Sequence, residues 1–359
     1  MTRVGLAAIA TAHPSYRLSR TEWLRIADRI SPPEVDRAVL ARLAERSAIE
    51  SRWCAAFEGD SSDGDGAFYR RGETPGTAQR MQLWSRAAGA MSREAAVRAL
   101  ADASVEPGAV THLVTASCTG FESPGIDARL IEALGIRRSV QRLNVGFMGC
   151  HAAVNALVAA RNAVAADPGA VVLVVAVEVS SAHFHHSARL DRLVANTLFA
   201  DGAAAIVVRA ARRGDPCIAG THATLIPQSH AEMAWQVGDH GFEMTLGAAV
   251  PDILHREVGA WVDAALATHD LTRAAVGGWA IHPGGPRVID RVADALGLDE
   301  GQTAASRAIL REYGNMSSAT LPFILKRLAA EGVPLPWVGL AFGPGLVGEM
   351  IVVGDAAGA

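Results

Sequence analysis

The sequence is poor in lysine, cysteine and long apolar runs, and each shortage excludes a class of protein. Lys326 is the only lysine, and a formal net charge of −4 leaves no basic field for nucleic acid. The four cysteines form no CxxC pair and have no histidines at metal-finger spacing, which argues against a disulfide scaffold or a zinc finger. No stretch reaches the ~18 apolar residues of a membrane helix, and the apolar start is too short for a signal peptide. We therefore expect a cytoplasmic protein with reduced thiols and neither a nucleic-acid nor a membrane partner.

What the chain does contain is core-forming residues in a strand–helix order. Its 359 residues, 50% hydrophobic and 19% charged, suffice for about two domains of ~150 residues. Strands and helices alternate after the first 110 residues, which is typical of α/β folds. The run Ala170–Val179 predicts a strand covered on both faces. A helix at 251–268, a strand at 276–281 and a helix at 285–296 repeat the pattern, so we expect two α/β halves that join near residue 214.

Cys150 stands where a strand predicted over 140–145 turns into a helix predicted over 151–166. The positive end of a helix dipole and free backbone N–H groups favour the thiolate, which is the nucleophilic form. Gly146 and Gly149 let the backbone turn tightly and leave the sulfur uncrowded. The pattern predicts a nucleophilic cysteine, although a buried core cysteine fits it too.

Two polar residues of the second half lie at comparable junctions. His282 ends a predicted strand and precedes a Pro-Gly-Gly-Pro turn, at the strand end where α/β sheets keep their ligand crevice. Asn315 precedes a helix predicted over 317–331. Taken singly, the histidine fits a side chain satisfied by a turn carbonyl, and the asparagine fits a helix cap.

These residues belong to five ordered blocks: Gly146–Cys150, Asn196–Ala205, Trp279–Pro286, Gly314–Ser318 and Phe342–Gly345. With them the chain resembles the type III polyketide synthases, the chalcone-synthase-like condensing enzymes of the thiolase fold, from about residue 3 to 354. The resemblance implies an α/β thiolase-like fold of two similar halves, 1–213 and 214–359, in a layered αβαβα core. It also implies a homodimer, although Ser123 replaces the methionine that many plant relatives send across the interface.

The resemblance implies acyl transfer in polyketide biosynthesis. Cys150 takes an acyl starter from a coenzyme A (CoA) thioester, and His282 holds its thiolate as an ion pair. Malonyl-CoA then loses CO₂, and His282 and Asn315 donate hydrogen bonds to the enolate, each worth ~3–4 kcal/mol in the transition state. Repeated condensation and cyclisation lead to a pyrone or a phenolic product. The CoA thioesters are substrates, and no metal or redox cofactor is implied.

Further positions match the family's substrate pocket. Phe184 matches a gatekeeper aromatic, and Met244 stands where the second gatekeeper is usually phenylalanine, which predicts a more adaptable pocket mouth. The remaining positions matched to the pocket are Cys118, Thr119, Ser317, Pro344 and Gly345.

Three arginines are expected to bind the CoA phosphates. Arg42 and Arg46 match two of the family's basic positions and lie four residues apart, on one helix face. The family's third basic position is Val39 here, and Arg287, just after Pro286 where plant relatives have alanine, is expected to compensate. Solvated surface arginines would look the same in the sequence.

Other readings fit less well. A 3-oxoacyl-[acyl-carrier-protein] synthase III shares the fold and the Cys–His–Asn set, but it usually has Gln-Ala-Asn after the histidine and Thr-Ser after the asparagine. A thiolase has a second catalytic cysteine near its carboxyl end, and no cysteine follows Cys217. A papain-like hydrolase uses the same three residue types on a different order of elements. An inactive partner subunit is disfavoured because Cys150, His282 and Asn315 are all intact.

Overall fold

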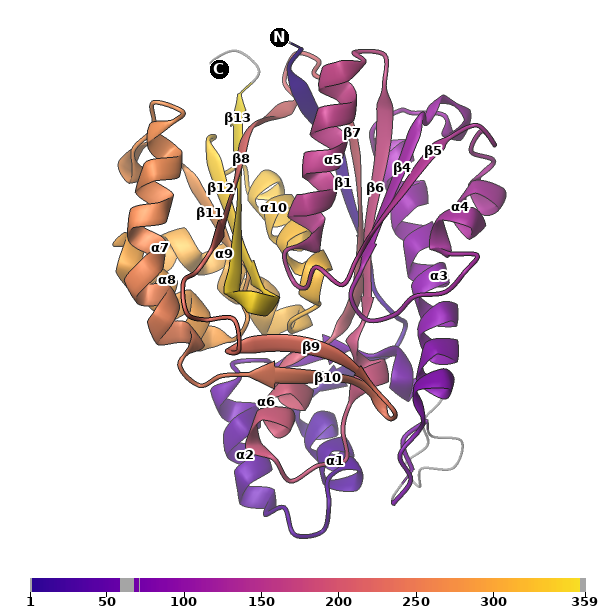
Figure 1. Ribbon diagram of the computed structural model, residues 1–359, viewed down its shortest axis with the longest axis vertical. Coiled ribbons are helices and arrows are strands. Elements are labelled where there is room, and N and C mark those ends of the chain that lie inside the picture. The colour runs from indigo at the N-terminus through magenta and orange to yellow at the C-terminus, as the bar shows by residue number, and fades with distance from the viewer. Residues whose placement is uncertain (1, 59–67, 71, 356–359) are drawn as a thin grey trace.

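A nine-stranded mixed sheet forms the centre of the molecule in the computed structural model, which describes residues 2–58, 68–70 and 72–355 (Figure 1). The strand order is β11-β12-β13-β8-β1-β7-β6-β4-β5. The strands are β1 (Val4–Ala12), β4 (His112–Ser117), β5 (Gln141–Gly146), β6 (Val171–Val179), β7 (Asp201–Ala210), β8 (Pro216–Leu225), β11 (Gly278–Ile281), β12 (Trp337–Gly343) and β13 (Val347–Asp355). Two small antiparallel sheets have two strands each. One pairs β2 (Arg17–Ser19) with β3 (Ser51–Trp53), and the other is a hairpin of β9 (Met233–Gly238) and β10 (Gly241–Leu246).

The two halves of the sheet repeat one pairing pattern. In the first half β1–β7 and β7–β6 are antiparallel, and β6–β4 is parallel. In the second half β8–β13 and β13–β12 are antiparallel, and β12–β11 is parallel. The halves meet where Gly5 of β1 pairs with Cys217 of β8. The boundary predicted between residues 213 and 214 falls in the loop between β7 and β8.

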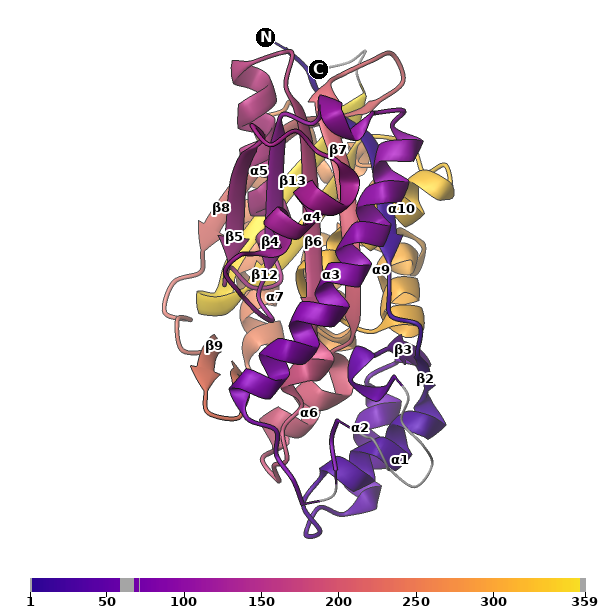
Figure 2. The ribbon, with the colours of Figure 1, turned by 90° about the vertical axis from the view of Figure 1, so that its right-hand side faces the viewer.

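Helices cover both outer faces of the sheet and fill the space between its halves. They are α1 (Arg20–Ile30), α2 (Arg37–Arg46), α3 (Thr77–Asp102), α4 (Ile126–Leu134), α5 (Ala152–Ala166), α6 (Leu190–Leu198), α7 (Val250–Ala267), α8 (Pro286–Leu296), α9 (Glu300–Tyr313) and α10 (Thr320–Ala330). One core joins α5 and α10 to the inner faces of both halves. The helix α3 covers the outer face of the first half (Figure 2), and α7 and α8 cover that of the second. The expected αβαβα layering is thereby confirmed.

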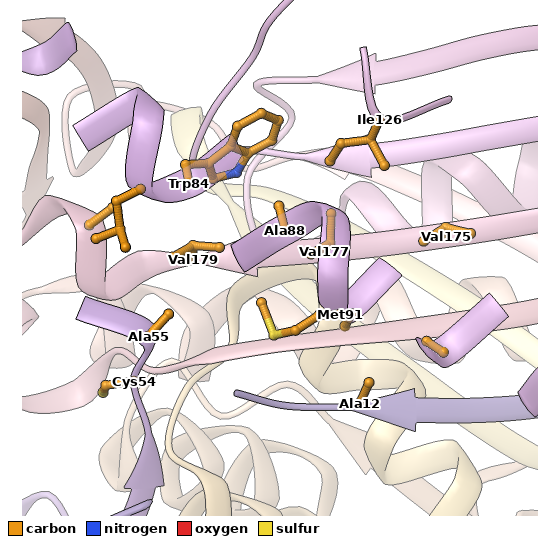
Figure 3. Packing of buried hydrophobic residues seen from close by; sticks show 14 of the residues in the cluster. Ala12, Cys54, Ala55, Trp84, Ala88, Met91, Ile126, Val175, Val177 and Val179 are labelled. Carbon is orange, nitrogen blue, oxygen red and sulfur yellow. The ribbon is translucent and has the colours of Figure 1, made fainter. Parts of the chain in front are cut away.

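The layering follows from the period of two along each strand. Val175 and Val177 of β6 face α3, where they pack near Trp84, Ala88 and Met91 (Figure 3). Their neighbours in the strand sequence face α5 instead and belong to the central core. A strand with both faces buried needs apolar residues at every position, which explains the unbroken hydrophobicity of this segment.

Most predicted elements are present. The helix predicted near 285–296 is α8, and the strand predicted at 276–281 is β11. The elements that were not predicted are the helices α6 and α9, the central strand β8, the short strands β2 and β3, and the hairpin β9–β10. The hairpin lies with α1, α2 and α6 at one end of the molecule, below the ends of the sheet strands (Figure 1). In the described part of the chain no helix is both long and apolar enough to cross a membrane.

Candidate active site

Cys150, His282 and Asn315 line one small cavity, although they come from different halves of the chain. Cys150 lies in the turn before α5, His282 directly after β11 and Asn315 directly after α9. The cavity has a volume of about 20 Å³, room for about one water molecule. The topology therefore assembles the three residues that the sequence analysis selected.

Burial shifts the pKa values of the Cys150 thiol and the His282 imidazole toward their neutral forms. The Ser317 hydroxyl lies 3.5 Å from Cys150 Sγ, and burial raises the pKa of Cys150 to about 12. Burial also lowers the pKa of His282 to about 3, and neither of its ring nitrogens has a hydrogen-bond partner among the described residues. Each charged form is disfavoured in this apolar site. Both pKa shifts disfavour the thiolate–imidazolium pair expected from the sequence, and that pair stays a prediction.

The side chain and the backbone of Asn315 make separate contacts. Its Oδ1 accepts a hydrogen bond from the Ser317 backbone N–H at 2.9 Å, so its amide N–H groups remain for another acceptor. Its backbone N–H donates to Leu198 O at 2.9 Å, and its carbonyl accepts from the Ala200 N–H at 2.8 Å. Ser317, with φ +48°, lies in the left-handed region, and this strained turn aims its hydroxyl at Cys150.

A second cavity, also of about 20 Å³, adjoins Cys150 on another side. The predicted pocket residues Cys118, Thr119, Met244, Ser317 and Pro344 all line it. Gly345 lines none of the cavities described here and lies in the turn before β13, with φ +76°.

Glu178 holds one wall of this second cavity and was missed as a functional residue. It is fully buried at the end of β6 and accepts hydrogen bonds from the backbone N–H groups of Cys118 and Thr119 at 3.0 and 3.1 Å. The hydroxyls of Thr119 and Ser318 donate to the same carboxyl group. Burial raises the pKa of Glu178 while these donors lower it. The sequence signal was a single acidic residue within an apolar strand.

Phe199, rather than Phe184, lines the cavities beside Cys150, where the gatekeeper aromatic was expected. Phe199 lines both cavities that contain Cys150, and a third cavity next to them. Phe184 borders only the third cavity and packs in an aromatic cluster with Trp23 and Tyr69. Counting residues from Glu178 could not distinguish the two phenylalanines, because only the folded chain brings Phe199 next to Asn315.

A larger cavity of about 420 Å³ leads from the surface toward Cys150. It shares Met233, Leu246, Val250, Gly284 and Val288 with the cavity of the three central residues. Its lining is mostly apolar, and Arg46, Arg287 and Asp191 carry its charges.

Of the three arginines expected around this cavity, Arg42 is the exception. It is exposed on α2 and does not line the cavity, whereas Arg46 from the same helix does. Arg287 also lies 3.7 Å from Asp252, which partly balances its charge.

The arrangement combines a cysteine thiol, an imidazole and an amide donor at the inner end of a mostly apolar cavity. A thiol forms thioesters by acyl transfer, and the two donors suit an oxygen on which negative charge develops. In the described ranges no three His, Cys, Asp or Glu side chains are grouped to hold a metal ion.

Comparison with known proteins agrees with this chemistry. Residues 4–212 match the family model "Chalcone and stilbene synthases, N-terminal domain", and residues 218–356 match the corresponding C-terminal domain. The chain is 33% identical to a 1,3,6,8-tetrahydroxynaphthalene synthase of Streptomyces peucetius, over 97% of this chain and 92% of the relative. It is 30% identical to the "alpha-pyrone synthesis polyketide synthase-like" Pks18 of Mycobacterium tuberculosis, over 96% and 89% of the two chains.

The fold is shared with solved structures as well. PKS-I of the brown alga Ectocarpus siliculosus superposes with a TM-score of 0.94 at 32% identity and covers 99% of both chains. The type III polyketide synthase domain of Steely1 from Dictyostelium superposes with a TM-score of 0.90 at 26% identity, over 98% of this chain and 99% of that one. The chain therefore belongs to the chalcone and stilbene synthase family and is a type III polyketide synthase, an acyltransferase that condenses CoA thioesters.

Proposed function

We propose that Cys150 is the acyl-carrying nucleophile, and that His282 and Asn315 are its catalytic partners. The observation that supports this assignment best is the single cavity that the three side chains line, with both His282 ring nitrogens unpartnered. A buried imidazole without partners is costly unless a ligand supplies them.

In the proposed acylation, the starter thioester places its carbonyl carbon against Cys150 Sγ. His282 accepts the thiol proton as the C–S bond to the enzyme forms, and the departing CoA thiolate takes that proton as the original C–S bond breaks. This route begins from the neutral pair, so it needs no preformed thiolate.

Condensation then uses the same two partners as hydrogen-bond donors, with neutral His282 in the tautomer whose N–H faces the substrate. Malonyl-CoA loses CO₂, and His282 together with the Asn315 amide stabilises the negative charge on the thioester oxygen of the enolate. The carbanion attacks the Cys150 thioester, and the chain grows by two carbons and leaves Cys150 as a CoA thioester. Because decarboxylation itself supplies the carbanion, we propose that turnover requires no metal or redox cofactor.

The larger cavity is the proposed binding site for the CoA arm of both substrates. Its apolar lining suits the flexible pantetheine chain, and Arg46 and Arg287 stand ready for phosphate groups. Its shared wall with the catalytic cavity gives the thioester a direct path to Cys150.

We further propose a short acyl starter, two or three malonyl units, and a pyrone or phenolic product. Phe199, Met244 and Trp235 line the space beside Cys150, and such bulky side chains favour small acyl chains. Trp235 sets part of this limit, because its indole N–H donates to Cys118 O at 2.6 Å and its ring stands between the second and third cavities.

The assembly is proposed to be a homodimer that acts in the cytoplasm. Strand β5 pairs with β4 alone, and five of its six residues are exposed. Leu143 on β5 and the nearby Met148 and Phe121 are 47%, 42% and 54% exposed. An edge strand with exposed apolar side chains favours pairing with a second copy. Light scattering on the wild type and on Leu143→Asp tests this: a dimer that becomes a monomer supports it, and a monomeric wild type refutes it.

The decisive experiment incubates the purified chain with malonyl-CoA and starters from acetyl- to palmitoyl-CoA, and reads products by mass spectrometry. We expect products spaced by two-carbon units, largest in amount with short starters, present with chelator and absent from Cys150→Ala. A Cys150→Ala variant that still condenses would refute the assignment of the nucleophile. Preference for palmitoyl-CoA would refute the proposed starter class.

A further inference from the structure

A second histidine, His151, follows the proposed nucleophile and is tied to the other half of the chain. Its side chain is 2% exposed, and its Nδ1 lies 2.8 Å from Asn155 Oδ1, one helical turn later in α5. The Asn155 amide nitrogen donates to Glu349 Oε1 on β13, also at 2.8 Å. The three side chains form a continuous chain of hydrogen bonds from the turn of Cys150 to the C-terminal half.

This chain fixes the tautomer of His151. The nitrogen of the Asn155 amide faces Glu349, so the oxygen of the same amide faces His151. An amide oxygen only accepts hydrogen bonds. His151 Nδ1 must therefore carry the proton. In the neutral ring Nε2 then holds a lone pair, so the Glu349–Asn155–His151 order selects one of the two neutral forms.

Two glycines let the turn that carries Cys150 interlock with the turn after β12. A Cβ atom on Gly149 would lie 2.0 Å from Pro344 Cδ, and one on Gly343 would lie 2.5 Å from His151 Cδ2. The proline ring thus occupies the space beside one glycine and the imidazole the space beside the other. Pro344 and Cys150 line the same cavity. A displacement of His151 would therefore shift the turn of Cys150 and the turn of Pro344 together.

The charge state of His151 also bears on His282. A protonated His151 lowers the pKa of His282 by charge repulsion, so it would oppose transfer of the Cys150 proton to His282. Burial lowers the pKa of His151 itself, which favours the uncharged ring. The titratable groups around it are Cys150 in its own turn, His282 after β11 and Glu349 on β13.

We propose that His151 is a positioning residue of the condensation reaction: the Glu349–Asn155–His151 chain holds the Cys150 turn against Gly343 and Pro344 and keeps an uncharged imidazole beside His282. The inference rests on Cys150 and His282 acting as proposed above. It gives a role to a buried polar chain that the reaction scheme itself does not use.

Two substitutions separate positioning from packing. His151→Phe keeps a ring of similar shape but has no donor for Asn155, whereas His151→Gln keeps an amide donor and cannot be protonated. We expect His151→Phe to lower kcat about tenfold, within the 10²-fold that a displacement of 1 Å can cause, with KM for malonyl-CoA within about twofold. His151→Gln should restore kcat, and in both variants the acidic limb of the kcat profile should move to lower pH because the titrating imidazole is gone.

A surface variant and a second readout make the result interpretable. His269→Phe alters a histidine that pairs with His222 on the outer face of β8 and β13, whereas Glu349 meets Asn155 on their inner face, and it is expected to leave kcat and the pH profile unchanged. Equal kcat losses in His151→Phe and His151→Gln, or an acidic limb that does not move, would overturn the proposal.

Failure of the proposed catalytic roles is distinguishable from failure of this inference. The rate of iodoacetamide alkylation at Cys150, measured by peptide mass spectrometry, reports the position of the thiol without any turnover. A changed rate in His151→Phe with a wild-type rate in His151→Gln supports the inference even if the starter is unknown. An unchanged rate in both variants, with only a lower melting temperature in His151→Phe, would reduce His151 to a packing residue.

Discussion

Phe199 and Asn315 are joined as an isolated parallel β-bridge between the two halves of the chain. The bridge is built from backbone groups alone, with Asn315 N–H donating to Leu198 O and Ala200 N–H donating to Asn315 O. It places the aromatic ring that borders three cavities next to the amide proposed to bind the enolate. Because the side chain of Asn315 takes no part in the bridge, its chemistry is separable from its position.

Replacing Asn315 by alanine should reduce catalysis and also lower the melting temperature, because it removes both the amide donor and the acceptor of the buried Ser317 N–H. We expect kcat to fall by about 10²-fold or more, the usual effect of removing one oxyanion donor. Asn315→Asp, with the same shape and no amide N–H, should be as slow at pH 7 to 8. Steady-state kinetics and thermal melting check this, and an Asn315→Asp enzyme at wild-type rate would show that the amide does not act as a donor.

Trp235 is expected to limit product length. Its removal in Trp235→Ala joins the second and third cavities, so products should gain two-carbon units or starters of greater length should be accepted. Trp235→Phe keeps most of the ring and loses only the hydrogen bond to Cys118 O. It serves as the matched control and should keep the wild-type product range. Identical product masses from all three enzymes would show that Trp235 does not limit product length.

Arg46 and Arg287 should affect the binding of CoA thioesters rather than the chemical step. Loss of one charged contact to a phosphate is worth about 1 kcal/mol at a half-exposed site, so we expect KM to rise about fivefold in Arg46→Gln. The effect in Arg287→Gln should be smaller, because Asp252 already shares that charge. Arg42→Gln, exposed and outside the cavity, is the control. The prediction fails if Arg42→Gln raises KM as much as Arg46→Gln does.

Alkylation of Cys150 should depend on pH as expected for a neutral buried thiol. Its pKa is raised to about 12, so below that value the thiolate is the minor form and increases tenfold with each pH unit. The iodoacetamide rate should therefore rise from pH 6 to 9 without a plateau, and it should be the same in His282→Ala. A plateau near pH 6 that disappears in His282→Ala would instead reveal a thiolate–imidazolium pair.

The large features of the fold were predictable because they rest on local sequence periodicity. The continuous apolar run of β6 and the strongly amphipathic helix α8 are each determined by residues adjacent in the chain. The hairpin β9–β10 was missed although Phe242, Met244 and Leu246 alternate with polar residues, because its two six-residue strands lie outside the strand–helix order of the large sheet. Its place beside the active site is decided by tertiary contacts that no local pattern records.

The residues of the candidate site likewise fall into those that local motifs identify and those that only tertiary contacts place. Cys150, His282 and Asn315 each follow a recognisable junction between elements, so short motifs identified them. Phe184 was predicted in place of Phe199 because both residues follow Glu178 in the chain. Only the bridge to Asn315 shows that Phe199 is the one that lies near Cys150. Likewise Arg42 and Arg46 share a helix face in the sequence, but only Arg46 reaches the cavity. Distances between remote segments decided these cases.

Cys217 of β8 pairs with Gly5 of β1 on one side and with Gly354 of β13 on the other. The first and last strands of the chain therefore flank a single strand, about 10 Å apart from each other at the usual strand spacing. A few added residues would span that gap, and the turn at 211–215 offers a place to open the backbone instead. A circular permutant that begins at Gly214 would keep every contact of the catalytic cavity, so the order in which the two halves are synthesised is independent of the site that they form together.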